Sequence, residues 1–362
     1  MSTQDMPPTT GSAMYQTMHR QPEDLRRLLT GGWDAAARGA ELLAEAQRIF
    51  VVGIGTSYHA ALVGEWLLRA AGRDARAVMS FDFATYPDAY PLGVRDAVVV
   101  MAHSGVKTFS TRALERAREA GATVISVGSL TAEHPGSQLV LRTVERERSA
   151  AFTASHTAAM TVLAQVATEL GERRRWPQVA GFRAALERLP EQVAEALARE
   201  GEILPVAQTC LGRQTYAAGS GPNGPTALEA VIKVREAARA HIDALPLEQF
   251  LHGPLVVVNA GDVAILVNVR GAEPATASRC REVARVLDRI GASLWVVGQG
   301  VPELPEAAVF ELPEVAETIS PILAVVPMQI LAYHVAVLMG SDPDRFRRDD
   351  PRYADALSLL TL

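Results

Sequence analysis

The sequence contains few residues that would cross-link the chain or hold a metal. Cys210 and Cys280 are its only cysteines, so a disulfide framework is excluded, and they show no metal-ligand spacing with the eight histidines. We therefore expect neither a disulfide-stapled secreted domain nor a zinc module. We interpret both cysteines as structural thiols, and we expect no metal and no other cofactor.

Long apolar runs and concentrated charge of one sign are also missing. No apolar stretch reaches the roughly 18 to 20 residues of a membrane-spanning helix, and residues 1–5 lack the basic start of a secretory signal. The arginine-rich pieces 142–148 and 345–352 are interrupted by acids, and the net charge is −6. These absences predict a soluble, cytoplasmic protein that binds neither membrane nor nucleic acid.

The sequence does show an alternation of strand and helix patterns in its first half. Runs of β-branched and apolar residues predict strands at 48–52, 97–101 and 123–127. Apolar residues at helical spacing follow the first strand over 59–71 and the second over 113–120. This order predicts a doubly wound α/β domain with a parallel sheet, which binds ligands at the carboxyl ends of its strands.

The second half repeats the order of the first. A strand with its glycine turn is predicted at 215–221 and further strands at 263–267 and 293–297, with helices from Pro225 and over 276–290. A long apolar helix is predicted over 321–339, and 154–200 is predicted to be mostly helical and to join the halves. The repetition predicts a fold of two pseudo-repeated, flavodoxin-like α/β domains with parallel sheets.

We predict domain limits from the same patterns. Residues 1–13 are polar and are predicted to form a flexible leader, followed by a short helix that begins at Gln21. The first domain is predicted over 14–200 and the second over 201–362.

Two loops at predicted strand ends are suited to binding an anion. Gly55-Thr56-Ser57 lies in the first, and the second runs from His103 through Ser104 to Lys107 and Thr108. Small residues let the backbone approach a ligand, hydroxyl and N–H groups donate, and each loop opens a helix whose positive end favours negative charge. The alternative is that Thr56, Ser57 and Ser104 only cap their helices.

The helix predicted from Pro225 carries three charged residues on one face. Glu229, Lys233 and Glu236 are spaced i, i+4 and i+7, while most of its other residues are Ala, Val, Ile or Leu. A charged stripe on a helix that otherwise favours burial often marks a pocket. The alternative is an exposed face stabilised by a Glu–Lys pair.

Several of these segments together resemble one known family. Residues 55–62, 102–107 and 150–160 resemble the phosphosugar loops in the isomerase half of glucosamine-6-phosphate synthase. Ala227-Leu228-Glu229 through Glu236, followed sixteen residues later by His252-Gly253-Pro254, resembles its catalytic region. The resemblance begins near residue 14 and spans nearly the whole chain. On these motifs the chain is identified as a member of the double sugar-isomerase-domain (SIS) family.

The resemblance implies a role for each matching residue. It makes Glu236 the base that moves a proton between C1 and C2 of a sugar, with Lys233 and Glu229 as supporting residues. His252 would open the sugar ring from a neighbouring subunit, which implies a homodimer with a shared site. The anionic end of the sugar would be bound by residues of the three loops, namely Gly55, Thr56, Ser57, His103, Ser104, Lys107, Thr108, Ala150 and Thr153.

Departures from the family pattern concern the anion and the end of the chain. Where the family has Ser-Gln-Ser-Gly-Glu-Thr, residues 102–107 read Ala-His-Ser-Gly-Val-Lys, so two hydroxyls are replaced while an imidazole and an ammonium are gained. This is compatible with a sulfonated hexose such as sulfoquinovose, although Lys107 could equally point to solvent. Residues 354–362 lack the lysine with which the synthase forms an imine, and its glutamine amidohydrolase domain is not represented.

Three functions remain open at this point. The first is an aldose–ketose isomerase that acts through an enediol on a hexose with an anionic C6 group, either phosphate or sulfonate. The second is a deaminase or deglycase of an amino-sugar phosphate. The third is a sugar-phosphate-sensing module without catalysis, which the presence of both Glu236 and His252 disfavours.

Overall fold

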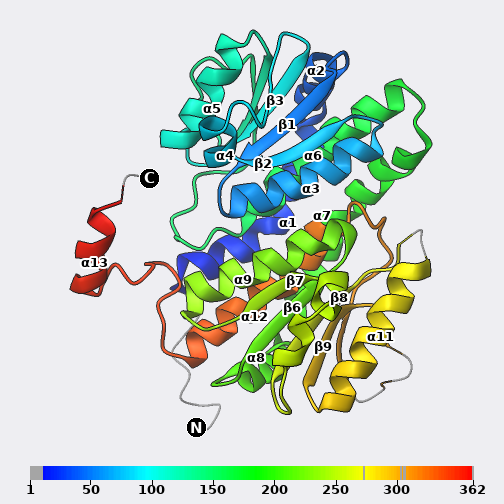
Figure 1. The fold of residues 1–362 in the computed structure, drawn as a ribbon, viewed down its shortest axis with the longest axis vertical. Helices are drawn as coiled ribbons and strands as arrows, with labels where there is room; N and C mark the ends of the chain where they lie inside the picture. The colour runs from blue at the N-terminus through cyan, green and yellow to red at the C-terminus, as the bar shows by residue number, and fades with distance from the viewer. Residues whose placement is uncertain (1–10, 272–273, 302–303, 305–306, 361–362) are drawn as a thin grey trace. The chain divides into compact units, whose positions relative to one another are not determined.

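The chain forms two compact units, each built around one parallel sheet (Figure 1). The computed structural model describes residues 11–271, 274–301, 304 and 307–360. The unit on sheet A, here called unit A, comprises Arg20–Glu147, Phe152–Pro190 and Asp350–Leu362. Unit B, on sheet B, comprises Met1–His19, Arg148–Ala151 and Glu191–Asp349. The domain limits that we placed at 200 and 201 remain a prediction.

Sheet A has the strand order β2-β1-β3-β4-β5, and every neighbouring pair is parallel. Its strands are β1 (Arg48–Gly53), β2 (Ala75–Met79), β3 (Asp96–Met101), β4 (Thr123–Gly128) and β5 (Leu139–Arg142). Its helices are α2 (Trp33–Leu43), α3 (Thr56–Ala70), α4 (Ser80–Thr85), α5 (Thr108–Glu119) and α6 (Ala154–Arg173). Phe50 and Val52 of β1 pack in one core cluster with Phe83 of α4 and Leu114 of α5. Because side chains alternate along a strand, Val51 faces the other side of the sheet, against Gly64 of α3.

Sheet B repeats this topology. Its order, read as β7-β6-β8-β9-β10, has the same succession, again with parallel pairing throughout. Its strands are β6 (Thr215–Gly219), β7 (Asp243–Pro246), β8 (Val263–Asn268), β9 (Ser293–Gly298) and β10 (Ala308–Glu311). Its helices are α8 (Leu204–Cys210), α9 (Gly224–Ala238), α10 (Leu247–Leu251), α11 (Pro274–Ile290) and α12 (Pro321–Leu338). The two-sheet, flavodoxin-like α/β fold predicted from the sequence is therefore confirmed.

The shared topology identifies where each sheet should bind a ligand. In this strand order the chain leaves the first strand in one direction and the third in the other, which opens a crevice at their carboxyl ends. In sheet A this switch point lies between β1 and β3, and in sheet B between β6 and β8.

The beginning of the chain differs from our prediction. Helix α1 (Ala13–Gly31) begins well before Gln21 and continues through Pro22. It begins early because the Asp344 carboxylate accepts hydrogen bonds from the N–H groups of Ala13 and Met14, at 2.7 and 2.9 Å. Most of the predicted leader, residues 1–10, lies outside the described residues.

The expectation that no stretch is long and apolar enough to cross a membrane is wrong for α12. Residues Pro321–Leu338 satisfy both criteria, with a mean hydropathy of 1.8. However, 89% of this stretch is buried inside the protein, as in the central helix of a globular domain. Within the described residues, the remaining helices longer than one turn are α7 (Phe182–Ala198) and α13 (Pro351–Ser358).

Candidate active site

The loop that follows β1 approaches its own helix closely. A Cβ on Gly53 would lie 2.5 Å from the carbonyl oxygen of Ser57, and Gly55 has a φ of 58°, a conformation that favours glycine. Because both positions need glycine, the loop turns tightly and directs the first residues of α3, Thr56 and Ser57, to the switch point of sheet A.

The second predicted anion loop joins β3 to α5. Gly105 within it has a φ of 94°, and Lys107 forms the N-cap of α5 by a reciprocal arrangement with Ser110. The Lys107 N–H donates to the Ser110 hydroxyl at 2.8 Å, and that hydroxyl lies 2.8 Å from the Lys107 carbonyl. The side chain of Lys107 is exposed, so its ammonium is accessible to a ligand as well as to water.

A cavity of about 20 Å³ lies between the two loops, large enough for a single water molecule. Three of the predicted anion-binding residues, Thr56, Ser57 and His103, line it. The rest of the described wall comes mainly from Ala102, Thr143, Phe152, Ser155 and His156. Gly55, Ser104 and Thr108 lie on the same two loops without lining this cavity. A sulfonate or phosphate would have to sit at the mouth of this cavity or widen it.

His103 is held at the cavity in its neutral form. Burial, with a smaller contribution from the charge of Arg146, lowers the pKa of His103 to about 4. Its ring packs edge-on against Phe152 with centroids 5.3 Å apart, and within the described residues neither ring nitrogen has a hydrogen-bond partner. A buried polar group without a partner costs stability, so the imidazole is a donor and acceptor available to a ligand.

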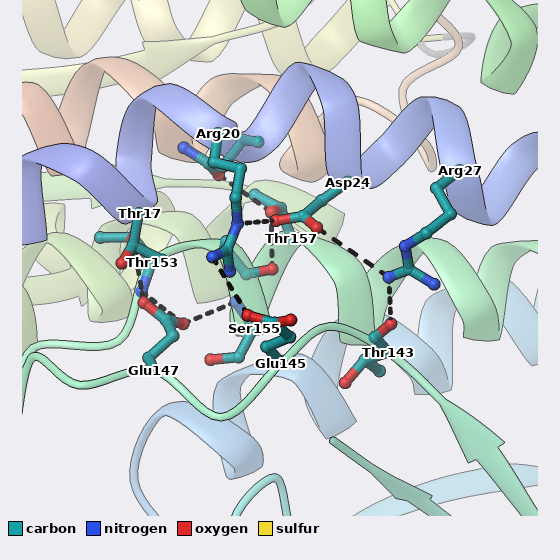
Figure 2. A network of polar contacts seen from close by, with 12 residues as sticks. Thr17, Arg20, Asp24, Arg27, Thr143, Glu145, Glu147, Thr153, Ser155 and Thr157 are labelled. Atoms are coloured by element: carbon teal, nitrogen blue, oxygen red, sulfur yellow. Dashed lines mark hydrogen bonds and ion pairs between the residues drawn. The ribbon is translucent and has the colours of Figure 1, made fainter. Parts of the chain in front are cut away.

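A buried carboxylate that the sequence analysis overlooked holds one wall of the cavity. Glu147 accepts the N–H of Thr153 at 3.0 Å, the hydroxyl of Thr153 at 3.2 Å and the N–H of Ser155 at 2.7 Å (Figure 2). These donors lie at the start of α6, whose positive end attracts a carboxylate. Arg27 donates to the carbonyl oxygen of Thr143, so another lining residue is also anchored (Figure 2).

The predicted segment 150–153 is divided between the units. Thr153 is fully buried in unit A, and its hydroxyl donates to Glu147, which gives it a structural role in this state. Ala150 belongs to unit B, where its N–H donates to the carbonyl oxygen of Asp344 at 3.2 Å. The anion-binding roles of Ala150 and Thr153 stay predictions.

In unit B, α9 brings together the three charged residues predicted to form the catalytic face. The side chains of Glu229 and Lys233 are 0% and 1% exposed, whereas that of Glu236 is 22% exposed. Lys233 Nζ lies 2.5 Å from Glu236 Oε2 and 3.6 Å from Glu229 Oε1. The exposed-face alternative is therefore wrong: a buried ammonium is held between a buried carboxylate and a carboxylate that reaches solvent.

His252 lies on a different part of unit B, at the end of α10. Its side chain is 68% exposed, and its Nε2 lies 3.0 Å from Glu248 Oε1. Glu248 also accepts a hydrogen bond from Arg279. Arg279, and to a lesser extent His252, lower the pKa of Glu248. The contacts of His252 thus run to Glu248, while those of Glu236 run to Lys233.

Sequence reasoning missed several residues of the two sites. Ser155 and His156 lie inside segment 150–160, which was singled out, but only their position at the start of α6 shows that they line the cavity. Glu147 was considered only as one acid among arginines. Thr143 has no local sequence signal, since β5 was not predicted. Among the described residues no group of three or more His, Cys, Asp or Glu could hold a metal ion.

Comparison with solved structures shows which proteins have this fold. The C-terminal domain of glucosamine-fructose-6-phosphate aminotransferase from Francisella tularensis superposes with a TM-score of 0.83 at 20% identity, covering 92% of this chain and 98% of that one. Tagatose-6-phosphate ketose/aldose isomerase from Escherichia coli superposes with a TM-score of 0.76 at 19% identity, covering 94% and 96%. The chain therefore has the same two-sheet fold as these two proteins.

Sequence comparison finds one matching domain and relatives over most of the chain. Residues 42–169 match the SIS domain. A glutamine–fructose-6-phosphate aminotransferase from Pyrococcus horikoshii is 30% identical over 342 residues, and its counterpart from Thermococcus kodakarensis is 29% identical over 360. Each match covers 92% of this chain and 56% of the relative. The chain thus spans little more than half the length of these curated relatives.

Proposed function

We propose that this protein is a cofactor-independent aldose–ketose isomerase that acts on a hexose with an anionic C6 group. The observation that carries the proposal is the state of Glu236: a carboxylate that reaches solvent at 22% exposure while a buried ammonium holds it at 2.5 Å. A general base must be accessible to the substrate and fixed in position. Lys233 fixes it, and Glu229 behind Lys233 balances the buried ammonium.

The isomerisation needs three kinds of group, and the chain offers a candidate for each. Glu236 would take the proton from C2 of the aldose and return it to C1 of the enediol. His252 would transfer the proton that opens the sugar ring, a task suited to imidazole because its ordinary pKa lies near neutrality. The loops of unit A are the candidates for binding the anionic group.

We infer that the anion carries a single charge, as a sulfonate does. A phosphate monoester bears nearly two negative charges at pH 7. At the cavity, by contrast, His103 is neutral and Thr56 and Ser57 contribute uncharged hydroxyls. Lys107 and Arg146 supply positive charge from exposed positions nearby. Sulfoquinovose, isomerised to its ketose, is therefore the substrate we favour over a hexose 6-phosphate.

The exposure of His252 favours a site completed by a second copy of the chain. A ring-opening group that is 68% exposed lies in water, whereas proton transfer to a sugar is most effective when the group is held in place. We propose a homodimer in which His252 of one copy serves Glu236 of the other. The two free thiols, Cys210 and Cys280, are compatible with the reducing cytoplasm.

A turnover screen with a solvent-exchange readout tests this proposal. The full chain is incubated in D₂O with sulfoquinovose, glucose 6-phosphate, fructose 6-phosphate or glucosamine 6-phosphate, and products are followed by NMR. We expect interconversion of aldose and ketose, with deuterium incorporated at C1 of the ketose and at C2 of the aldose, fastest with the sulfonate. Faster turnover of a 6-phosphate would overturn the sulfonate assignment only, whereas no interconversion of any of these sugars would overturn the isomerase.

A deaminase is the second candidate, because glucosamine-6-phosphate deaminase from Thermotoga maritima shares this fold with a TM-score of 0.71 at 18% identity. Deamination would also use a carboxylate base at C2, so the sites alone do not separate the two reactions. Release of ammonia from glucosamine 6-phosphate in the same screen would identify the deaminase and exclude simple isomerisation.

A further inference from the structure

Unit B contains a second copy of the glycine loop that forms the anion site in unit A. Gly219 and Gly221 follow β6 with the spacing that Gly53 and Gly55 have after β1. Gly221 has a φ of 53° against 58° at Gly55. A Cβ on Gly219 would lie 2.2 Å from the carbonyl oxygen of Asn223, matching the close approach at Gly53.

The position of one glycine in the second loop is also repeated, although Gly105 has a φ of 94° and Gly271 does not have a positive φ. Gly271 precedes the first residue of α11, Pro274, by three positions, as Gly105 precedes Thr108 at the start of α5. Gly221 and Gly271 follow β6 and β8, the two strands that border the switch point of sheet B. Unit B therefore retains the backbone elements with which sheets of this order bind ligands.

A carboxylate of the protein lies across this second pair of loops. A Cβ on Gly271 would lie only 2.2 Å from Glu317 Oε2, so the carboxylate packs directly on the glycine backbone. A Cβ on Gly221 would lie 3.6 Å from Glu317 Oε1. The Glu317 carboxylate is thus the anion at the switch point of sheet B.

The neighbouring residues hold this arrangement in place. The amide of Asn223 donates to the hydroxyl of Ser320 at 2.7 Å, and that hydroxyl donates to the carbonyl oxygen of Glu317 at 2.7 Å. Pro222 occupies the position that Thr56 has in unit A, and proline offers neither a backbone N–H nor a hydroxyl to a ligand. This loop is therefore fitted to an internal partner rather than to an exchanging one.

We propose that Glu317 is a built-in occupant of a second anion site, and that it restricts external anions to unit A. The two units then differ by occupancy: the anion comes from outside in one and from the chain in the other. Removing the carboxylate should uncover a latent site for a small carboxylate ion. This inference does not depend on which reaction the protein catalyses.

Chemical rescue of Glu317→Ala by formate tests the proposal. Thermal unfolding of the full chain is measured in sodium formate and in sodium chloride of equal ionic strength. We expect the variant to unfold at a lower temperature than the parent in chloride, and formate to raise its Tm by about 2 °C or more beyond any effect on the parent. Glu314→Ala, an exposed acid three residues away, is the matched control and should respond like the parent.

Two further variants decide the remaining outcomes. Gly271→Ala in the Glu317→Ala background should abolish the formate effect, because the new Cβ fills the place of the carboxylate. If Glu317→Ala does not fold in either salt, Glu317→Gln, which keeps the shape but removes the charge, should lower Tm without responding to formate. An unchanged Tm in Glu317→Gln, or an equal formate response in Glu317→Ala and the parent, would overturn the proposal.

Discussion

The switch points of the two sheets share the glycine turn after the first strand and have different contents. In unit A, Gly53 and Gly55 support a cavity that Thr56, Ser57 and neutral His103 line. In unit B, Gly219 and Gly221 match these two glycines, and the carboxylate of Glu317 packs on Gly271 and near Gly221. The comparison teaches that a duplicated fold can keep its binding geometry while a few side chains decide whether an external ligand enters.

The contributions of the two units to the proposed reaction differ as well. Unit B carries the buried ion-pair cluster of Glu229, Lys233 and Glu236, whereas unit A carries the hydroxyls and the imidazole. If binding and proton transfer are divided in this way, substitutions in unit A should change KM and those on α9 should change kcat.

Removing the proposed base should have the largest effect. We expect Glu236→Gln to lower kcat by about 10²- to 10⁴-fold, since general base catalysis contributes that much, with KM changed less than about twofold. Steady-state kinetics measure kcat and KM, and deuterium exchange at C2 of the aldose measures proton transfer. A variant with the kcat of the parent would show that another group moves the proton.

Breaking the ion-pair cluster should have the largest effect on stability. Lys233→Met leaves the buried Glu229 without its cation, which costs about 3–5 kcal/mol of unfolding free energy. Denaturant unfolding measures the loss. Lys107→Met is the matched change at an exposed lysine in unit A and should cost less than about 0.5 kcal/mol; equal costs would mean that the cluster does not stabilise unit B.

Alanine at the first glycine of the turn should lower the stability of both units by a similar amount. Gly53→Ala and Gly219→Ala place a Cβ 2.5 and 2.2 Å from backbone carbonyl oxygens, and each should cost about 1–3 kcal/mol by overpacking. Gly201→Ala, where a Cβ would meet nothing within 4 Å, should change stability by less than about 0.5 kcal/mol. Tolerance of one substitution but not the other would end the equivalence of the two loops.

Removing positive charge near the cavity should weaken binding without slowing the chemistry. We expect Lys107→Ala to raise KM about tenfold, equivalent to about 1.4 kcal/mol, with kcat unchanged. Arg146→Ala should act in the same direction, since its charge already influences His103. An unchanged KM for Lys107→Ala would mean that its ammonium serves only the solvent-exposed surface.

Acid sensitivity should be the smallest effect, and in unit A we expect it from His103. His103 has a pKa of about 4 in the folded chain against an ordinary value of 6.5, so below pH 6.5 the unfolded chain binds a proton that the folded chain does not. The free energy of unfolding is therefore unaffected by His103 above pH 6.5 and falls as the pH is lowered from 6.5 towards 4. Burial, then Arg142, lowers the pKa of His134 to about 4 as well.

His103→Gln should therefore flatten the loss of stability between pH 6.5 and 4, as followed by unfolding at several pH values. Glutamine keeps hydrogen-bonding capacity at the cavity but does not titrate. An equally steep loss in the variant would assign the acid sensitivity to other groups, such as His134.

The central strands could be predicted from the sequence and the edge strands could not. Strands β1, β3, β4, β8 and β9 were each located within one residue and β6 within the segment 215–221, because strands in the middle of a parallel sheet are buried on both faces and form apolar runs. The four missed strands, β2, β5, β7 and β10, are the outermost strands of their sheets and are partly exposed. Their residues follow no strong pattern because pairing on one side defines them.

The same distinction applies to the candidate sites. The charged face of α9 follows from helical spacing, and the glycine loops follow from strand ends, so local sequence was sufficient to find both. Glu147 and Glu317 were not found because a carboxylate that closes a loop is recognised only when the loop is folded around it.

By itself, the sequence determined the alternation of strands and helices, the duplication and the residue types at each strand end. These properties depend on periodicity and on contacts between near neighbours. Only the tertiary structure decided that Asp344 starts α1, that Glu147 anchors the start of α6 and that Glu317 lies at the switch point of sheet B. Each of these carboxylates lies against backbone that the fold brings to it, and this pairing exists only after the chain has folded.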